Sequence, residues 1–413
     1  MASEWPPWWR RARLGDVADL AWGDTSTTKA AYVADGIPAY SASGPDGCLE
    51  YADFDRTGIV LSAIGADCGK TWLAKGKWSC IKNTIRFWAS DPSVDTEFLY
   101  WLTCDPAIWP KRGSAQPFIS QGDARALEVA YPPLPEQRAI AHILGTLDDK
   151  IELNRRRNET LEAMARALFQ SWFVDFDPVR AKAEGRDPGL PKPLADLFPD
   201  RFEDSELGEI PAGWALGTLA DYANLNPETW SKETRPEVIE YVDLANTKWG
   251  RITSTSMYAQ RDAPSRAQRV LRPGDAIIGT VRPGNGSYTH IADEGLTAST
   301  GFAVLRPLTT ADEELVYLAS TAPENIERLS HLADGAAYPA VRAEVVLATL
   351  VTKPPRPVIE RFSSLTNPVL AKTAQNERES RNLAALRDAL LPKLISGELR
   401  VRDVERFVAG ATA

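Results

Sequence analysis

The sequence has few residues of the types that usually carry metal or redox chemistry. It contains four cysteines, and their spacing provides no C-x-x-C pair for a metal site or a disulfide-exchange site. Its three histidines, His142, His290 and His331, are far apart and stand in no catalytic motif. We therefore expect neither a metal centre nor a histidine-dependent active site on this chain.

Long apolar runs are also lacking. No stretch approaches the length that spans a bilayer, and residues 1–7 lack the basic and apolar regions of a signal peptide. The hydrophobic content of 44% and the charged content of 25% are typical of a folded globular protein. The expected location is the cytoplasm, with the cysteine thiols reduced.

An overall excess of positive charge is absent as well. The formal net charge is −9, which argues against indiscriminate binding of polyanions. Lysines nevertheless cluster between positions 70 and 82, and arginines cluster between positions 261 and 282. Each cluster is either a local phosphate-binding patch or a solvated face.

What the sequence does contain is an internal repeat. A shift of 222 residues places Pro132 on Pro354, Asn154 on Asn376 and Leu168 on Leu390 without a gap. The segment 14–19 is echoed by the segment 216–221 at a shift of 202 residues. The chain is therefore two copies of one unit, in which a globular module of short strands and a small helix is followed by a long helix.

The two long helical segments show the alternating steps of four and three that are typical of a coiled-coil seam. If the halves are related by a pseudo-two-fold axis, the helices run antiparallel and their centres meet. Asn154 and Asn376 lie near those centres, so we expect them to face each other and fix the register. The alternative is that both face solvent. The seam positions are Ile140, Leu144, Leu147, Ile151, Asn154, Asn158, Leu161, Ala165, Leu168 and Trp172, then Val358, Phe362, Leu365, Val369, Lys372, Asn376, Glu379, Leu383, Leu386 and Leu390.

Catalytic motifs are missing. The segment 65–71 has three residues between its glycines where a phosphate-binding P-loop needs four, so we interpret it as a turn between strands. No glycine-rich adenosylmethionine loop, Asn-Pro-Pro-aromatic segment or nuclease-type acidic pair is present. The sequence indicates binding rather than catalysis.

Several motifs together resemble one family, the specificity (S) subunit of type I restriction-modification systems, over nearly the whole chain. The long segment 132–141, with Gln137 and Arg138, and the segments 147–156 and 158–162 resemble its central region. Further similar motifs are residues 113–120, 172–178 and 208–214. The second helix departs from the pattern at 361–366, so the resemblance supports partner docking more strongly at the first helix.

The resemblance implies an α+β fold: two mixed α/β target-recognition domains in a pseudo-two-fold arrangement, separated by two long antiparallel helices that form a coiled coil. It implies a non-catalytic subunit in which each domain reads one half of a split DNA target. The expected boundaries are target-recognition domain 1 at 1–131, the first spacer helix at 132–175, a connector at 176–209, target-recognition domain 2 at 210–352, the second spacer helix at 353–397 and a C-terminal tail at 398–413.

The partners that the resemblance implies are double-stranded DNA, two modification subunits and restriction subunits, without a membrane. Modification subunits bind S-adenosylmethionine and methylate adenine at N6, and restriction subunits use ATP and Mg, so this chain itself would carry no cofactor. Gln137, Arg138 and His142 are the candidates for contacting the modification subunit.

Specificity requires side chains that reach base edges, whereas much of the affinity comes from phosphate contacts. Basic and amide side chains beside glycine and proline are the candidates, because such loops approach DNA closely. For Ser114 and Gln116 the alternative is a surface turn packed against the start of the helix. The DNA-binding candidates are Lys70, Lys111, Arg112, Ser114 and Gln116 in the first module, and Arg266, Arg269, Arg282, Asn285, Tyr338 and Arg342 in the second.

Two other readings of the sequence remain. One is a non-catalytic scaffold whose duplicated modules bind protein on a coiled-coil rod. The other is a fused enzyme with an unrecognised active site, which adenosylmethionine binding by the isolated chain would favour.

Overall fold

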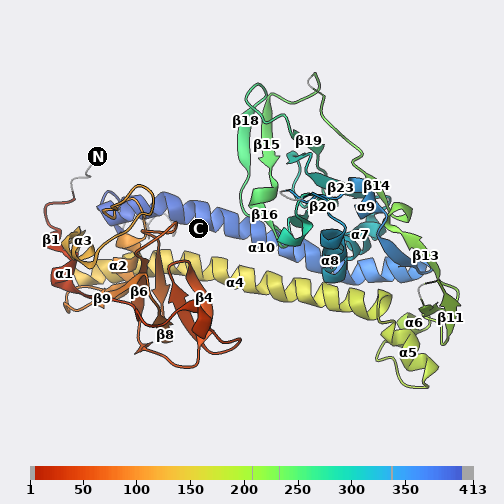
Figure 1. Cartoon of the computed structure of the whole chain (residues 1–413), viewed down its shortest axis with the longest axis horizontal. Coiled ribbons are helices and arrows are strands. Elements are labelled where there is room, and N and C mark those ends of the chain that lie inside the picture. The colour runs from red at the N-terminus through yellow and green to blue at the C-terminus, as the bar shows by residue number, and fades with distance from the viewer. Residues whose placement is uncertain (1–4, 207, 232, 336–337, 402–413) are drawn as a thin grey trace, which may run out of the picture. The chain divides into compact units, whose positions relative to one another are not determined.

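A computed structural model describes residues 5–206, 208–231, 233–335 and 338–401 (Figure 1). Residues 402–413, most of the expected C-terminal tail, lie outside the described part. The described residues fold into two compact units, one of residues 5–153 with 379–401, and the other of residues 154–378. Each unit combines a sheet-rich module with parts of two long helices.

The first unit contains two four-stranded sheets, with the strand orders β2-β9-β6-β7 and β4-β3-β8-β5. The strands β1 and β10 form a separate antiparallel pair beside the first long helix. The elements are β1 (Arg10–Arg13), α1 (Leu14–Val17), β2 (Ala18–Trp22), η1 (Lys29–Ala31), β3 (Ile37–Ser41), β4 (Gly44–Leu49), β5 (Phe54–Asp55), β6 (Gly58–Ser62), β7 (Thr71–Ala74), β8 (Lys77–Cys80), β9 (Thr84–Ala89), α2 (Thr96–Thr103), α3 (Gln121–Ala126) and β10 (Glu128–Tyr131).

The second unit has the same plan, with the strand orders β14-β23-β20-β21 and β18-β15-β22-β19 and the pair β13-β24. The elements are α5 (Asp177–Ala183), α6 (Lys192–Ala195), β11 (Phe202–Ser205), β12 (Gly208–Pro211), β13 (Ala215–Thr218), η2 (Leu219–Asp221), β14 (Ala223–Leu225), β15 (Val238–Val242), η3 (Leu244–Asn246), β16 (Thr247–Lys248), β17 (Arg251–Ile252), β18 (Ser256–Ala259), β19 (Ala267–Val270), β20 (Ala276–Gly279), η4 (Pro283–Asn285), β21 (Tyr288–His290), β22 (Leu296–Ser299), β23 (Phe302–Pro307), η5 (Thr310–Asp312), α7 (Glu313–Ser320), α8 (Pro323–His331), α9 (Ala343–Leu347) and β24 (Leu350–Lys353).

The correspondence between the modules extends to strand direction. The central contact of the second sheet is parallel in both modules, between β3 and β8 in one and between β15 and β22 in the other. In both modules the sheet that carries β6 or β20 packs its apolar face against a short helix, α2 or α7. Two modules with the same strand order and the same parallel pair confirm the duplicated α/β plan expected from the sequence.

The two long helices are α4 (Leu134–Phe173) and α10 (Arg356–Ser396). Prolines precede α4, where the missing N–H groups cost nothing, and Gly397 with φ +74° ends α10 in the left-handed conformation that favours glycine. Figure 1 shows both helices as long unbroken ribbons, α4 in yellow and α10 in blue. Among the described helices none is both long and apolar enough to cross a membrane.

The helices pair antiparallel within each unit. In the first unit the early part of α4 meets the late part of α10, where Asp148 pairs with Arg387 and Lys150 lies 3.4 Å from Glu379. In the second unit the late part of α4 meets the early part of α10, and Trp172 packs on Phe362 with ring centroids 5.8 Å apart. These opposite pairings confirm the expected antiparallel helix pair.

The seam on α4 lies where the heptad pattern places it, and on α10 the pattern holds at Val358, Phe362 and Asn376 but not at every position. Leu365, Lys372 and Leu386 are exposed, so their assignment to the seam is wrong. Thr366 and Leu370 are buried in the same region of α10. The pattern fails at those three positions because the middle of α10 is rich in polar residues, so few apolar residues define which side of the helix is buried.

Candidate nucleic-acid interface

In the first module, two stretches far apart in sequence form one loop edge beyond strand β6. The Gly65 N–H donates to the Pro117 carbonyl at 3.0 Å, and the Ile119 N–H donates to the Ala63 carbonyl at 2.8 Å. The β6–β7 connection that contains Gly65 is a turn between antiparallel strands, as the sequence predicted in place of a P-loop. This edge joins residues 63–70 to residues 112–119.

All five DNA-binding candidates of the first module belong to this edge or directly flank it. Lys70, Lys111, Arg112, Ser114 and Gln116 are exposed. Two of the cations are partnered by acids, since Lys70 lies 2.5 Å from Asp67 and Arg112 pairs with Asp123. The structure therefore gathers three cations, a hydroxyl and an amide on one surface, with carboxylates behind two of the cations.

The second module repeats this loop edge beyond strand β20. The Val341 N–H donates to the Thr280 carbonyl at 2.9 Å, and the Arg282 N–H donates to the Pro339 carbonyl at 2.7 Å. The guanidinium of Arg282 lies 5.0 Å from the centre of the Tyr338 ring, a cation–π arrangement. Tyr338 is 73% exposed, so one aromatic face remains open to a ligand.

Three of the six candidates in the second module come together at this edge. The Asn285 N–H donates to the Arg282 carbonyl at 2.9 Å, which adds an exposed amide to the Arg282–Tyr338 pair. Arg342 follows the same segment and is exposed at the start of α9. Lysine, arginine, asparagine and glutamine are the side chains that read base edges and phosphates, and tyrosine stacks on bases.

Arg266 and Arg269 lie apart from that cluster, next to the edge strand β19. Arg266 lies 3.8 Å from Asp243. Arg269 is partly buried and donates from Nη1 to Thr229 Oγ1 at 3.2 Å, and burial lowers the pKa of its guanidinium. The side-chain contacts of these two arginines are thus with Asp243 and Thr229.

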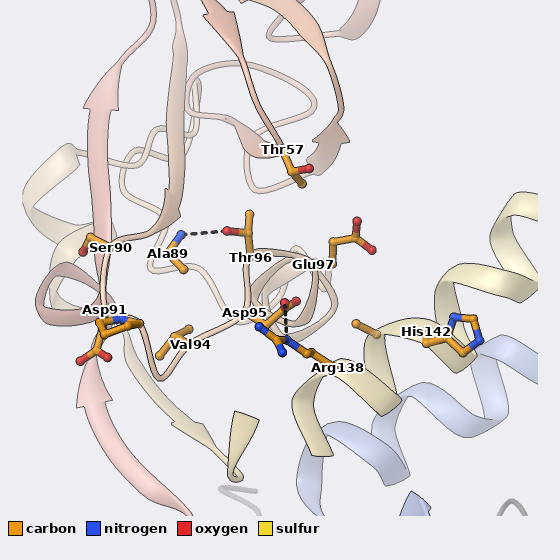
Figure 2. Close-up of a pocket in the computed structure, with 12 residues that line it drawn as sticks. Thr57, Ala89, Ser90, Asp91, Val94, Asp95, Thr96, Glu97, Arg138 and His142 are labelled. Atoms are coloured by element: carbon orange, nitrogen blue, oxygen red, sulfur yellow. Dashed lines mark hydrogen bonds and ion pairs between the residues drawn. The ribbon is translucent and has the colours of Figure 1, made fainter. Parts of the chain in front are cut away.

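The candidates for partner binding lie at the start of α4, beside a cavity of about 540 Å³ in the first unit. Figure 2 shows Arg138 and His142 on one wall and the segment that leads into α2 on the other. Arg138 Nε lies 3.9 Å from Asp95 Oδ2, and both Arg138 and His142 are exposed. These two residues are accessible to a partner subunit.

Gln137 is not accessible, and the prediction that it binds a partner is wrong for this structure. Its side chain is fully buried. Its Nε2 donates to the carbonyls of Ser93 and Pro132 at 2.8 Å, and its Oε1 accepts from the Asp95 N–H at 2.9 Å. These three hydrogen bonds hold the turn before α2 against the start of α4, so Gln137 has a structural role within the first unit.

Asn154 and Asn376 lie opposite each other in the second unit. Both side chains are buried, and Asn154 Nδ2 donates to the Asn376 carbonyl at 3.4 Å. Asn376 Nδ2 donates to Asn158 Oδ1 at 2.8 Å, and Asn158 Nδ2 donates to the Thr373 carbonyl at 3.1 Å. Solvent exposure, the alternative for Asn154 and Asn376, is excluded by their burial. Asn158, a predicted seam residue to which the sequence assigned no role in register, also takes part in this contact.

No cluster of three or more histidine, cysteine or acidic side chains able to hold a metal ion is present within the described ranges. The exposed loop edges of both modules include side chains that donate hydrogen bonds, carry positive charge or present aromatic faces. Their chemistry is suited to recognising a nucleic acid.

Residues 6–163 match the family described as the type I restriction modification DNA specificity domain. A type I restriction enzyme specificity subunit of Methanocaldococcus jannaschii, MjaIX, is 25% identical, over 97% of this chain and 95% of that protein. The HindI specificity subunit of Haemophilus influenzae is 27% identical, over 76% of this chain and 81% of that protein.

A solved S subunit of a type I restriction-modification system from M. genitalium has the same fold, with a TM-score of 0.59 and 16% identity. The match covers 95% of this chain and 97% of that one. The duplicated modules and the antiparallel helices of this chain are thus the fold of a solved S subunit. Residues 6–163 of the chain match a type I restriction-modification DNA specificity domain, and the chain is similar over nearly its whole length to specificity subunits of these systems.

Proposed function

We propose that this chain is a DNA specificity subunit that reads a split target in double-stranded DNA, with one module on each half of the sequence. The observation that carries the proposal is the identical strand order of the two modules, each of which ends in the same loop edge. Two equivalent scaffolds with different loop residues are suited to reading two different short sequences. The half-sites need not resemble each other, because Gln116 and Ser114 occupy one edge where Arg282 and Tyr338 occupy the other.

Each edge offers a distinct chemistry for base recognition. An arginine such as Arg282 donates two hydrogen bonds to the O6 and N7 of guanine, whereas an amide such as Gln116 pairs with the N6 and N7 of adenine. Lysines such as Lys70 and Lys111 suit the phosphate backbone, where they add affinity without sequence information. Because the net charge of the chain is −9, electrostatic attraction to DNA has to come from such local cations.

The modification subunits are proposed to dock on the helical regions, with Arg138 and His142 contributing at the start of α4. The cavity beside them is lined by Asp91, Asp95 and Glu97. Arg138 lies 3.9 Å from Asp95 and Lys75 lies 3.1 Å from Glu97. This leaves Asp91 for a partner side chain with positive charge. S-adenosylmethionine would bind to the modification subunits, and ATP and Mg to restriction subunits that join them. In this arrangement the chain supplies recognition and its partners supply catalysis.

The test is to co-express the chain with its modification subunits and to map N6-methyladenine by single-molecule sequencing. Gln116→Ala is expected to relax one half of the methylated motif, and Arg282→Ala is expected to relax the other half. Loss of one good base contact costs about 1–3 kcal/mol of discrimination. Arg201→Ala, which removes an exposed arginine of the β11–β12 region, is the matched control and should leave the motif unchanged.

The protein-binding scaffold makes the opposite prediction. If the modules bind only protein, the Gln116 and Arg282 substitutions leave the methylated sequence untouched while the partner remains active. A change in both halves from a single substitution would also contradict the assignment of one module to each half-site.

A further inference from the structure

The two modules depart from their common plan at a connection between two strands. Strands β3 and β4 of the first module are joined by the two residues Ala42 and Ser43. The corresponding strands of the second module, β15 and β18, are joined by the 13 residues 243–255. This longer connection contains the hairpin β16–β17, which packs against β21.

The tip of this hairpin presents a tryptophan in an unfavourable backbone conformation. Lys248 pairs with Arg251 across the hairpin, so Trp249 and Gly250 form a two-residue turn with φ +47° and +83°. Such a turn favours asparagine followed by glycine, because bulky side chains rarely adopt positive φ. Trp249 is nevertheless 58% exposed, so burial of the indole does not explain the residue type.

The turn is hydrogen-bonded to the chain around the start of β21, and the indole packs on this segment. The Trp249 N–H donates to the Gly286 carbonyl at 2.6 Å, and the Gly250 N–H donates to the Tyr288 carbonyl at 2.9 Å. The ring lies across Gly286, where an added Cβ would come within 2.5 Å of it, and it meets the Tyr288 ring edge-on at 6.0 Å. One side of the indole is therefore fixed on the protein while much of it remains open.

The hairpin rests on the loop that carries the DNA-binding candidates. Lys248 Nζ lies 3.4 Å from the Asn285 carbonyl, and Asn285 is hydrogen-bonded to Arg282. Trp249, whose ring packs on Gly286, therefore contacts the same loop that carries Arg282 and Asn285. An exposed indole beside amide and cationic groups is the combination that binds nucleic acid, through stacking or apolar contact with bases and through phosphate contacts.

We propose that the β16–β17 hairpin is a DNA-contacting element present in the second module alone, with Trp249 placed against base or deoxyribose carbons and Lys248 placed near a phosphate. This inference rests on the proposed function. A partner protein subunit is the competing occupant, but the adjacent Lys248, Arg282 and Asn285 favour a polyanion with hydrogen-bonding edges. The first module has no such element, because its β3–β4 turn is too short to form one.

A photo-cross-linking amino acid at position 249 tests the contact in the full complex with its modification subunits. The complex is irradiated on a duplex that carries the methylated motif, and the cross-linked nucleotides are mapped. Cross-links in the half-site that Arg282→Ala relaxes are expected. The same amino acid at position 257 is the control, since Met257 is 63% exposed on β18, away from the hairpin. Cross-links from position 249 to a protein subunit, or no more DNA cross-linking than from position 257, would overturn the inference.

Affinity gives a second readout. Trp249→Ala should weaken binding of the motif duplex about tenfold, which corresponds to about 1.4 kcal/mol. Trp249→Phe should stay within about threefold of the wild type, because a smaller aromatic ring still stacks. If the wild-type complex methylates a split motif while Trp249→Ala binds that motif as tightly, the hairpin inference fails and the proposed function stands. If the wild-type complex shows no sequence-specific methylation, the proposed function fails and the inference fails with it.

Discussion

The buried asparagines of the second unit give a prediction that a double-mutant cycle can test. Asn376 Nδ2 donates to Asn158 Oδ1 at 2.8 Å, and both side chains are buried between the helices. Truncation of either residue to alanine leaves the other with an unsatisfied buried polar group. We expect each single substitution to lower the free energy of unfolding by about 1–3 kcal/mol.

The double substitution Asn158→Ala with Asn376→Ala removes both partners, so neither is left unsatisfied by the other. Its cost should fall short of the sum of the single costs by about 1–2 kcal/mol. Truncation of Asn376 leaves its backbone carbonyl in place, so the contact from Asn154 Nδ2 remains. The cycle therefore isolates the bond between Asn158 and Asn376.

Urea unfolding of the full chain, followed by circular dichroism, measures the four variants of the cycle. Asn382→Ala is the matched control, because Asn382 is an exposed asparagine on the same helix and should change stability by less than about 0.5 kcal/mol. A coupling energy near zero, or an Asn376→Ala variant as stable as Asn382→Ala, would refute the reasoning.

Three further substitutions test single features. Gln137→Leu should lower the free energy of unfolding by about 2 kcal/mol, because it leaves the three backbone groups that Gln137 bonds unsatisfied. The substitution Arg138→Leu, at an exposed position, should not lower it. Urea midpoints that coincide for the two variants would contradict the structural role of Gln137. Burial raises the pKa of the Glu314 carboxyl above its usual value of 4.5, so its contribution to stability is full below pH 4.5 and falls as pH rises towards the raised pKa. Glu314→Gln should raise the melting temperature at pH 7 and remove this pH dependence. A lower melting temperature of Glu314→Gln at pH 7 would contradict the prediction. Arg306→Leu should lower the free energy of unfolding by about 3 kcal/mol, because the fully buried Asp275 then loses its charge partner. Each kcal/mol corresponds to about 2–4 °C in melting temperature. A melting temperature within about 2 °C of the wild type would therefore contradict the prediction.

The sequence predicted the helical framework because helix periodicity is a local signal. The steps of four and three on α4 identified the buried Ile140, Leu144 and Trp172. The same reasoning failed at Leu365 and Leu386 on α10, where polar residues interrupt the pattern. The repeat also predicted that the modules share a plan, but it could not give the strand order, since β3 pairs with β8 across many intervening residues.

The candidate site was predictable only in part, for a physical reason. The glycine and proline residues beside polar side chains indicated the two loops that form the edge with Gln116 and the edge with Arg282. The burial of Gln137 was not predictable, since a polar residue in the first turn of a helix gives no sign of which segment packs over it. Trp249 was missed because the β16–β17 hairpin has no counterpart in the first module and its neighbours come from a loop more than 30 residues later.

Single-molecule mapping of N6-methyladenine, in cells that express this chain with its modification subunits, tests directly whether each module reads one half-site. We expect one split motif, two short half-sites around a fixed gap of unspecified bases, which disappears when this chain is omitted. Methylation of a continuous, unsplit motif, or a pattern that is the same with and without this chain, would contradict the assignment of one recognition module to each half-site.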